Sequence, residues 1–401
     1  MLLSSKGLGS AMIIAGTSIG AGMLAIPATV AACGFWIASL LLVVTWFIML
    51  LTALLLAEVN LLMENGSNFT RMAYATLGKT GRFVTWVGYL LLLYSLTAAY
   101  TAGGGNLVSS GFLMLNLHLP AWLNSLIFIL ILGALVYSGT RAVDHANKLL
   151  MLLKFIAFLG FLLVILSAIR QDYLNVETQN INYLWLSFPI LVTSFGFHHV
   201  IPSLRTYVQS DRVTLRKAII IGSIIPLIVY ILWIAATLGS IPLYGKNSFQ
   251  EIISSGDITG GIVLSYHSGF IRHFVYSFEA IAVTTSFLGV TLGLFDFNRD
   301  TYGLEKKTGI NKLIVFIITF LPPLLFAIYY PSGFKVALGY ASIFVAVLLI
   351  ALPAAMVWVV RGRQGINHYA SKALLVAIIG VALLIIGLEI ATIGNLLPSL
   401  V

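Results

Sequence analysis

The chain has 401 residues, of which 60% are hydrophobic and only 9% are charged. Ordinary soluble domains carry about 25% charged residues, and even a large one leaves roughly a quarter of its chain's surface in water, so this composition excludes a soluble protein. The net charge of +9 is spread without a dense basic run. We therefore attribute it to orientation in a membrane rather than to nucleic-acid binding. The single cysteine, Cys33, excludes an intramolecular disulfide and a cysteine-based metal site.

Apolar runs separated by polar loops predict eleven membrane spans, each near the length of about 20 residues that a spanning helix needs. The first run lacks a small-residue cleavage site before polar sequence, so we expect it to stay in the mature protein rather than to act as a signal peptide. The longest loop, near 241–271, has room for short helices. The predicted spans lie near 8–33, 35–61, 82–111, 121–139, 146–170, 183–208, 215–240, 272–297, 312–330, 334–360 and 372–394.

The distribution of Lys and Arg over alternate loops predicts the orientation. Loops on the side of the N-terminus hold 16 of them, whereas loops on the other side hold four. Cytoplasmic loops are enriched in Lys and Arg, so we expect a cytoplasmic N-terminus. Because eleven is an odd number, the short tail at 395–401 is then expected on the periplasmic side.

Spans one and six are both interrupted near mid-depth. Span one contains GTSIGAG at Gly16–Gly22, and span six contains TSFGFHH at Thr193–His199, flanked by Pro189 and Pro202. Glycine eases departure from the helical conformation and proline removes a donor, so both helices are predicted to break. Unwound backbone at membrane depth is tolerated only where it faces a cavity or other protein. The freed polar groups therefore predict a binding site.

The two breaks lie five spans apart, which is the spacing expected when spans one to five and six to ten form an inverted repeat with substrate at the midplane. The repeats are then 1–170 and 171–362, and 363–401 holds an extra helix and a short external tail. The alternative is that Gly16 and Gly20 form only a close-packing helix face. The matching break in span six favours the binding site.

The sequence gives little support for an enzyme or a channel. The stretch Gly16–Gly20 matches the serine-hydrolase pattern G-x-S-x-G, but a nucleophile elbow needs a preceding strand, and here the pattern lies in an apolar helix. Zinc, phosphate-loop and dinucleotide motifs do not occur, so we expect no enzyme, no metal and no cofactor. A channel would need a repeated acidic lining or a pore ring, which the chain lacks. Uphill transport would then draw on an ion gradient.

Several stretches resemble the hydroxy and aromatic amino acid permease family of the amino acid-polyamine-organocation superfamily. They are GTSIGAGMLAIP at 16–27, TSFGFH at 193–198, TSFLGV at 285–290 running into GLFD at 293–296, and FLPP at 320–323. The likeness covers nearly the whole chain and is in particular to the bacterial tyrosine-specific members. One departure is His199, where glycine is expected, and it concerns substrate selectivity rather than the fold.

The resemblance implies an all-α membrane protein of the bacterial inner membrane with eleven transmembrane helices and a LeuT-like fold. That fold is a 5+5 inverted repeat with broken helices 1 and 6 plus one extra C-terminal helix. The implied function is proton symport of aromatic amino acids, tyrosine first, by alternating access. Tryptophan, phenylalanine or serine as substrate and sodium as coupling ion stay open as alternatives. The oligomeric state also stays open, a monomer being the simplest case.

A zwitterionic amino acid needs a partner for its carboxylate, its ammonium and its side chain. The half-helix beginning near Ala21 and Gly22 points N–H groups and a positive dipole end at the carboxylate. Carbonyls of Thr17, Ser18 and Phe195 can accept from the ammonium, and the resemblance supports these roles. His198 is the candidate partner for a phenolic hydroxyl, because a site that hydrogen-bonds a hydroxyl rejects the analogue lacking it. The predicted substrate site comprises Thr17, Ser18, Ile19, Gly20, Ala21, Gly22, Tyr94, Thr97, Tyr100, Thr101, Ser194, Phe195, Gly196, Phe197 and His198.

Lys154 is the first candidate for proton coupling. It lies about nine residues into span five, roughly 13 Å along the helix, and ionisable residues inside spans are functional candidates because they are costly there. In a related proton-coupled carrier, a span-five lysine stands where sodium-coupled relatives bind an ion, and the resemblance places Lys154 there. We predict that Lys154 binds and releases the proton near Thr285 and Ser286, with Glu279 as a second relay candidate. The alternative is an inert lysine reaching the interface.

Overall fold

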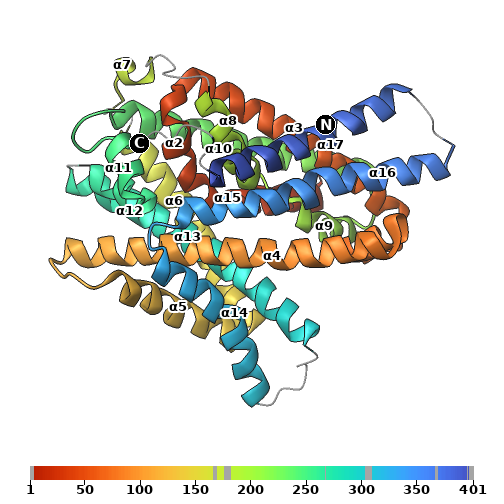
Figure 1. Ribbon diagram of the computed structural model, residues 1–401, viewed down its shortest axis with the longest axis horizontal. Coiled ribbons are helices and arrows are strands. Elements are labelled where there is room, and N and C mark those ends of the chain that lie inside the picture. The colour runs from red at the N-terminus through yellow and green to blue at the C-terminus, as the bar shows by residue number, and fades with distance from the viewer. Residues whose placement is uncertain are drawn as a thin grey trace.

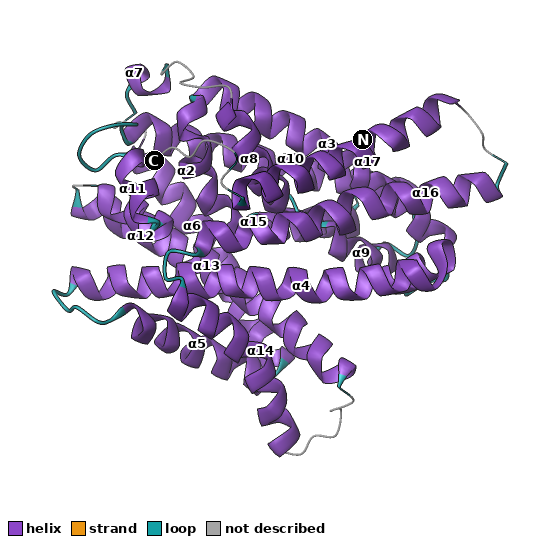
Figure 2. Ribbon diagram, in the orientation of Figure 1, coloured by secondary structure: helices purple, strands orange, loops and turns teal. Residues whose placement is uncertain are grey.

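The computed structural model describes residues 4–165, 169–175, 182–266, 268–302, 309–365, 369–394 and 396. Every regular element within these ranges is helical, as Figures 1 and 2 show. Among the described residues, ten helices are each long and apolar enough to cross a membrane, and the bent pair Ser5–Ser18 with Ala21–Cys33 raises the number to eleven. The predicted all-α membrane protein is therefore confirmed, and the chain is a multi-pass membrane protein.

The first five spans follow the predicted order closely. Gly78, with φ of 70°, interrupts α4 shortly before the predicted start of span three, in a backbone region that favours glycine. The residues before this kink thus form a separate helical segment ahead of the span. The elements are α1 (Ser5–Ser18), η1 (Ala21–Ala25), α2 (Ile26–Val30), η2 (Ala31–Cys33), α3 (Phe35–Leu62), α4 (Phe69–Met114), α5 (Ala121–Ser138) and α6 (Thr140–Ile165).

The second half of the chain contains the remaining six spans and the short helices expected in the longest loop. Span ten changes to a π-helix at η5 before Pro353, a local widening that often marks functional regions of helices. The elements are α7 (Gln171–Leu174), α8 (Asn182–Ser194), η4 (His198–Val200), α9 (Ile201–Tyr207), α10 (Arg212–Ser240), α11 (Phe249–Ser255), α12 (Ile258–Ser265), α13 (Gly269–Thr301), α14 (Gly309–Tyr329), α15 (Phe334–Val345), η5 (Ala346–Ala351), α16 (Leu352–Arg363) and α17 (Tyr369–Ile393).

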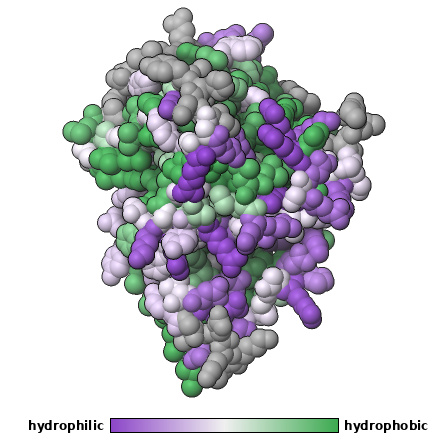
Figure 3. Space-filling view, turned by 90° about the vertical axis from the view of Figure 1, so that its right-hand side faces the viewer, coloured by the Kyte–Doolittle hydropathy of each residue, from purple (hydrophilic) through white to green (hydrophobic). Residues whose placement is uncertain are grey.

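The two ends of the molecule along its long axis differ in the elements that lie there. The short helices α7, α11 and α12 lie at the left of Figure 1, and the first residues of α4 lie at the right. Figure 3 looks onto the right-hand end, where hydrophilic residues spread across the centre and right of the face. This end corresponds to the predicted cytoplasmic side. Among the residues used to predict the orientation, Lys306, Lys307 and the tail positions 395 and 397–401 lie outside the described residues.

Helix α4 lies at the centre of the packing. It contacts α5, α13, α14 and α15 extensively, while α13 also packs along α6, and α1 packs along α10. The glycine triplet Gly103–Gly105 of α4 permits some of this close approach, since a Cβ at these positions would meet the side chains of Phe334, Phe128 and Ser125 in turn. The triplet therefore serves helix packing.

Candidate functional site

The predicted break in span one is present within the predicted stretch Gly16–Gly22. Helix α1 ends at Ser18, and Ile19 and Gly20 follow in non-helical conformations before the 3-10 helix η1 begins at Ala21. The two parts of the span are bent by 46°. A Cβ at Gly20 would collide with Oγ of Ser286 in α13, so the small residue lets α13 approach the unwound backbone. Ser286 Oγ accepts a hydrogen bond of 2.8 Å from the Ala21 N–H, which satisfies one donor freed by the break.

The predicted break in span six is also present. Helix α8 ends at Ser194, and the 3-10 helix η4 begins at His198. The side chains of Phe195 and Phe197 between them are fully buried. Ser194 Oγ donates to the Gly22 carbonyl at 3.1 Å, so the two unwound segments contact each other directly.

Tyr230 of α10 joins the two breaks. Its hydroxyl lies 2.6 Å from the Ser18 carbonyl and 2.7 Å from the Ser194 carbonyl, and its side chain is fully buried. A phenol carries one hydrogen, so it can fully satisfy only one of these carbonyls at a time. The other carbonyl retains acceptor capacity at the point where both spans unwind.

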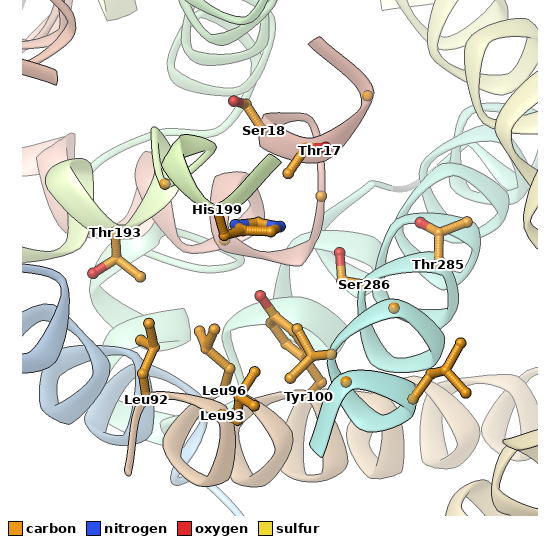
Figure 4. A pocket seen from close by; sticks show the side chains of 18 of the residues that line it. Thr17, Ser18, Leu92, Leu93, Leu96, Tyr100, Thr193, His199, Thr285 and Ser286 are labelled. Carbon is orange, nitrogen blue, oxygen red and sulfur yellow. The ribbon is translucent and has the colours of Figure 1, made fainter. Parts of the chain in front are cut away.

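A cavity of about 740 Å³ lies beside the two breaks, within the range of about 300–1,000 Å³ that small-molecule sites occupy. Figure 4 shows Thr17 and Ser18 at the end of α1 on one side, Leu92, Leu93 and Leu96 of α4 on the opposite side, and Ser286 of α13 on a third. Polar groups therefore gather at the breaks, whereas α4 supplies an apolar wall.

The cavity extends from the breaks toward the end of the molecule that holds the N-terminus. Met12 and Ile13 in α1, Asn147 near the start of α6 and Asp296 near the end of α13 also line it, and all four lie toward the predicted cytoplasmic ends of their spans. Met12 and Ile13 are exposed. The site is thus continuous with the predicted cytoplasmic side.

Short helices cover the opposite side. Helix α12 packs against α4, α13 and η1, and Thr259 Oγ1 donates to the Gly103 carbonyl at 3.3 Å. Asp257 caps this helix by accepting from the Gly260 N–H at 3.0 Å, and burial raises the pKa of its carboxyl. The end of the bundle predicted to be external is therefore closed by packed structure.

The structure brings together many of the residues predicted for the substrate site. The backbone of Ile19 and Ala21 contributes hydrogen-bonding groups beside the cavity. The cavity is lined by the predicted residues Thr17, Ser18, Gly20, Gly22, Tyr100, Ser194 and Gly196, together with Thr285 and Ser286.

Other predicted residues lie outside this lining. Phe195 and Phe197 are packed in the core. The Tyr94 hydroxyl donates to the Ile318 carbonyl at 2.9 Å, which directs it toward α14. Thr97 and Thr101 donate to carbonyls of their own helix. These side chains thus support the site from behind.

The two adjacent histidines face different ways. His198 is fully buried, and its Nε2 lies 2.9 Å from Thr52 Oγ1 in α3. His199 is exposed to the cavity, where Figure 4 shows its imidazole near the centre. The structure therefore places His199, rather than the predicted His198, where a bound molecule would contact it.

Lys154 lies where the sequence predicted an ion-coupling group. Its Nζ donates to the Ile19 carbonyl at 2.5 Å and to Thr285 Oγ1 at 3.5 Å, and its side chain is only 1% exposed. It thus joins spans one, five and eight at the first break. Glu279 lies on α13 before Thr285 and is fully buried, and neither of its carboxyl oxygens has a partner in the part of the chain that the structure describes.

Sequence reasoning missed Tyr230, His199 and the leucines of α4. Nothing local marks Tyr230, because its role depends on two carbonyls more than 30 residues away in the chain. The spacing of Leu92 and Leu96, one helical turn apart, signals a shared face. The described residues contain no group of three or more His, Cys, Asp or Glu side chains placed to hold a metal ion.

Comparison with known proteins identifies relatives along nearly the entire chain. The model of the tryptophan/tyrosine permease family matches residues 4–392. The chain is 33% identical to tyrosine-specific transport system 1 of Haemophilus influenzae, over 99% of this chain and 100% of that protein. It is 36% identical to tyrosine-specific transport system 2 of the same organism, over 90% and 89%. It is also 35% identical to the tryptophan-specific transport protein of that organism, over 86% of each. All three are transport proteins.

Proposed function

Because the chain belongs to the tryptophan/tyrosine permease family, we propose that it imports aromatic amino acids, tyrosine first, across the bacterial inner membrane by symport with protons. It is a transport protein and not an enzyme. The observation that carries the proposal is the meeting of two broken spans at one cavity that has polar backbone at one wall and leucines at the other. This division suits a molecule with a zwitterionic end and an apolar ring.

The packing of the helices supports a LeuT-like 5+5 arrangement with repeats at 1–170 and 171–362. Spans five and eight (α6 and α13) pack together about as extensively as spans ten and three (α15 and α4), and a shift of five spans converts the first pair into the second. Spans two and seven, three and eight, and four and nine also pack in pairs, and the same shift leaves each pair unchanged. Inverted repeats with broken helices at their interface produce this pattern.

We place the amino group and carboxylate of the substrate at the two breaks. The first turn of η1 offers the Gly22 N–H to the carboxylate, since the Ala21 and Met23 N–H groups already bond Ser286 Oγ and the Gly20 carbonyl. Gly20 and Gly22 allow close approach because they lack side chains. The ammonium then lies near the Ser18 and Ser194 carbonyls, of which Tyr230 can satisfy only one. The ring extends toward Leu92, Leu93 and Leu96 and contacts Tyr100.

The path of the cavity supports an inward-facing state. Most of the loop Lys and Arg residues lie on the side that holds the N-terminus, as is typical of cytoplasmic sides. The cavity extends toward this side, and α12 covers the other side. In this arrangement the substrate leaves toward the cytoplasm. Alternating access then requires that the external short helices separate and the N-terminal side close.

Lys154 is the proposed proton carrier. A charged ammonium inside the bundle needs acceptors, and the Ile19 carbonyl and Thr285 hydroxyl provide them at the first break. Loss of the proton would weaken these contacts, and the unwound segment would lose its tie to spans five and eight. Protonation of Lys154 would thereby be linked to the shape of the substrate site, with Glu279 as a second relay group.

The proposal is tested by uptake of labelled tyrosine into proteoliposomes that contain the purified chain. An imposed inward proton gradient in sodium-free buffer should drive accumulation above equilibrium, and a protonophore should abolish it. Unlabelled tryptophan, phenylalanine and serine serve as competitors, and protein-free liposomes are the blank. Absence of tyrosine accumulation, or accumulation only in the presence of sodium, would contradict the proposal.

A further inference from the structure

The side chain of His199 points into the cavity, whereas the side chain of the adjacent His198 points away from it. Both histidines lie in the 3-10 helix η4, in which successive side chains point about 120° apart because there are three residues per turn. His198 therefore faces Thr52 in α3, and His199 faces the cavity. The turn that ends the second break thus fixes the direction of the His199 side chain.

The position of His199 limits the space available to a ring. In Figure 4 its imidazole lies between Thr17 and Ser18 at the end of α1 and the wall formed by Leu92, Leu93 and Leu96, and all of these residues line the same cavity. A substrate held by its amino and carboxyl groups at the breaks must pass its side chain beside this imidazole to reach the leucines. The width of the side chain is therefore limited at this point.

His199 also has hydrogen-bonding capacity that the fold does not use. A neutral imidazole carries one donor and one acceptor, and none of the hydrogen bonds among the described residues involves that of His199, whereas His198 bonds Thr52. Leucines and valines, including Val345 and Leu349, form part of the surrounding wall. A polar atom on a side chain that passes His199 toward these residues would find a hydrogen-bond partner in its imidazole.

We propose that His199 is the residue that selects the side chain of the substrate, by hydrogen-bonding a ring hydroxyl and by excluding a ring system as wide as indole. The inference rests on the proposed function and makes it more specific, since it predicts preference for tyrosine over both phenylalanine and tryptophan. A site built to bond a hydroxyl discriminates against the analogue that lacks it, and a bulky wall discriminates against the larger ligand.

Two substitutions separate the two effects. His199→Leu keeps a side chain of similar bulk and removes the hydrogen bond, so phenylalanine should compete with tyrosine about tenfold better relative to the unchanged chain. His199→Gly removes the bulk, so tryptophan should gain about tenfold or more relative to tyrosine. His198→Gln is the matched control, because it alters the adjacent histidine, which faces Thr52, and it should leave both ratios unchanged.

The measurement is competition of unlabelled phenylalanine and tryptophan against labelled tyrosine in proteoliposomes, with the melting temperature of each variant as a check on folding. A wild-type chain that binds none of the three amino acids would contradict the proposed function and this inference with it. If the wild-type chain takes up tyrosine and both His199 variants show the same competition ratios as the wild type, the inference alone is overturned. Changed ratios in His198→Gln, with unchanged ratios in the His199 variants, would do the same.

Discussion

The two breaks reach the same cavity by different means. In span one the break contributes backbone groups: the Ala21 N–H donates to Ser286 Oγ, and the Ile19 carbonyl accepts from Lys154. In span six the residues between the helices are Phe195, Gly196 and Phe197, whose two aromatic rings are fully buried. The first break therefore provides polar contacts and connects to the ionisable group, whereas the second is anchored in the core and presents His199 from its far side.

The largest effect is expected at the ionisable contact of the first break. Lys154→Gln retains a polar side chain but removes the titratable group, so proton-driven accumulation of substrate should be lost while exchange of internal for external substrate persists. Uptake and counterflow in the same proteoliposomes measure the two activities separately. Unchanged uphill uptake by this variant would remove Lys154 from the coupling mechanism.

The next effect concerns the absence of a side chain at the first break. In Gly20→Ala the added Cβ overlaps Ser286 Oγ, and overpacking of this kind costs about 1–3 kcal/mol, so uptake at low substrate concentration should fall about tenfold or more. Gly16→Ala is the matched control, because its Cβ meets mainly the terminal methyl of Met151, a flexible side chain that adapts. Equal losses in the two variants would show that the close approach of Ser286 is unimportant.

A smaller effect is expected where the breaks are joined. Tyr230→Phe removes the hydroxyl shared by the Ser18 and Ser194 carbonyls, and leaving a buried acceptor unpaired costs about 1–3 kcal/mol. The melting temperature should fall, and the half-saturation concentration for tyrosine should rise about threefold to tenfold. Melting curves and uptake kinetics measure the two effects, and a variant that matched the unchanged chain in both would exclude Tyr230 as a link between the breaks.

The smallest effect on transport is expected from the anchor of the second break. Phe195 packs against the Tyr230 ring with centroids 4.9 Å apart and lies outside the cavity lining. Phe195→Leu should therefore lower the free energy of unfolding by about 1 kcal/mol and leave the preference between tyrosine and phenylalanine unchanged. A changed preference with an unchanged melting temperature would mean that Phe195 contacts the substrate.

The sequence was sufficient for the number of spans and for the positions of both breaks. These features depend on local properties, since apolar runs of membrane length and clustered glycine and proline act over a few residues. The contact of Lys154 with Thr285 was also predicted, because a cation deep in a span needs a partner and the family resemblance indicated where it lies.

The orientations of individual side chains could be predicted less well from the sequence. Whether His198 or His199 faces the cavity depends on the 3-10 turn at η4, and a model of the segment as an α-helix gives a different direction for each. Tyr94 and Tyr100 lie on the same helix six positions apart, so they project in different directions, and of the two only Tyr100 lines the cavity. The role of Tyr230 requires knowledge of which carbonyls the breaks leave open, and that depends on tertiary contacts.

We propose that the cavity between the breaks is the amino acid site and that it opens toward the side of the N-terminus. The chain's only cysteine, Cys33, is buried, so a cysteine introduced as Leu96→Cys in the cavity wall can be labelled selectively, with the wild-type chain as the blank. The account predicts that a membrane-impermeant thiol reagent labels this cysteine in inside-out vesicles and that saturating tyrosine slows the reaction. Labelling from the opposite side alone, or a rate that tyrosine does not change, would contradict it.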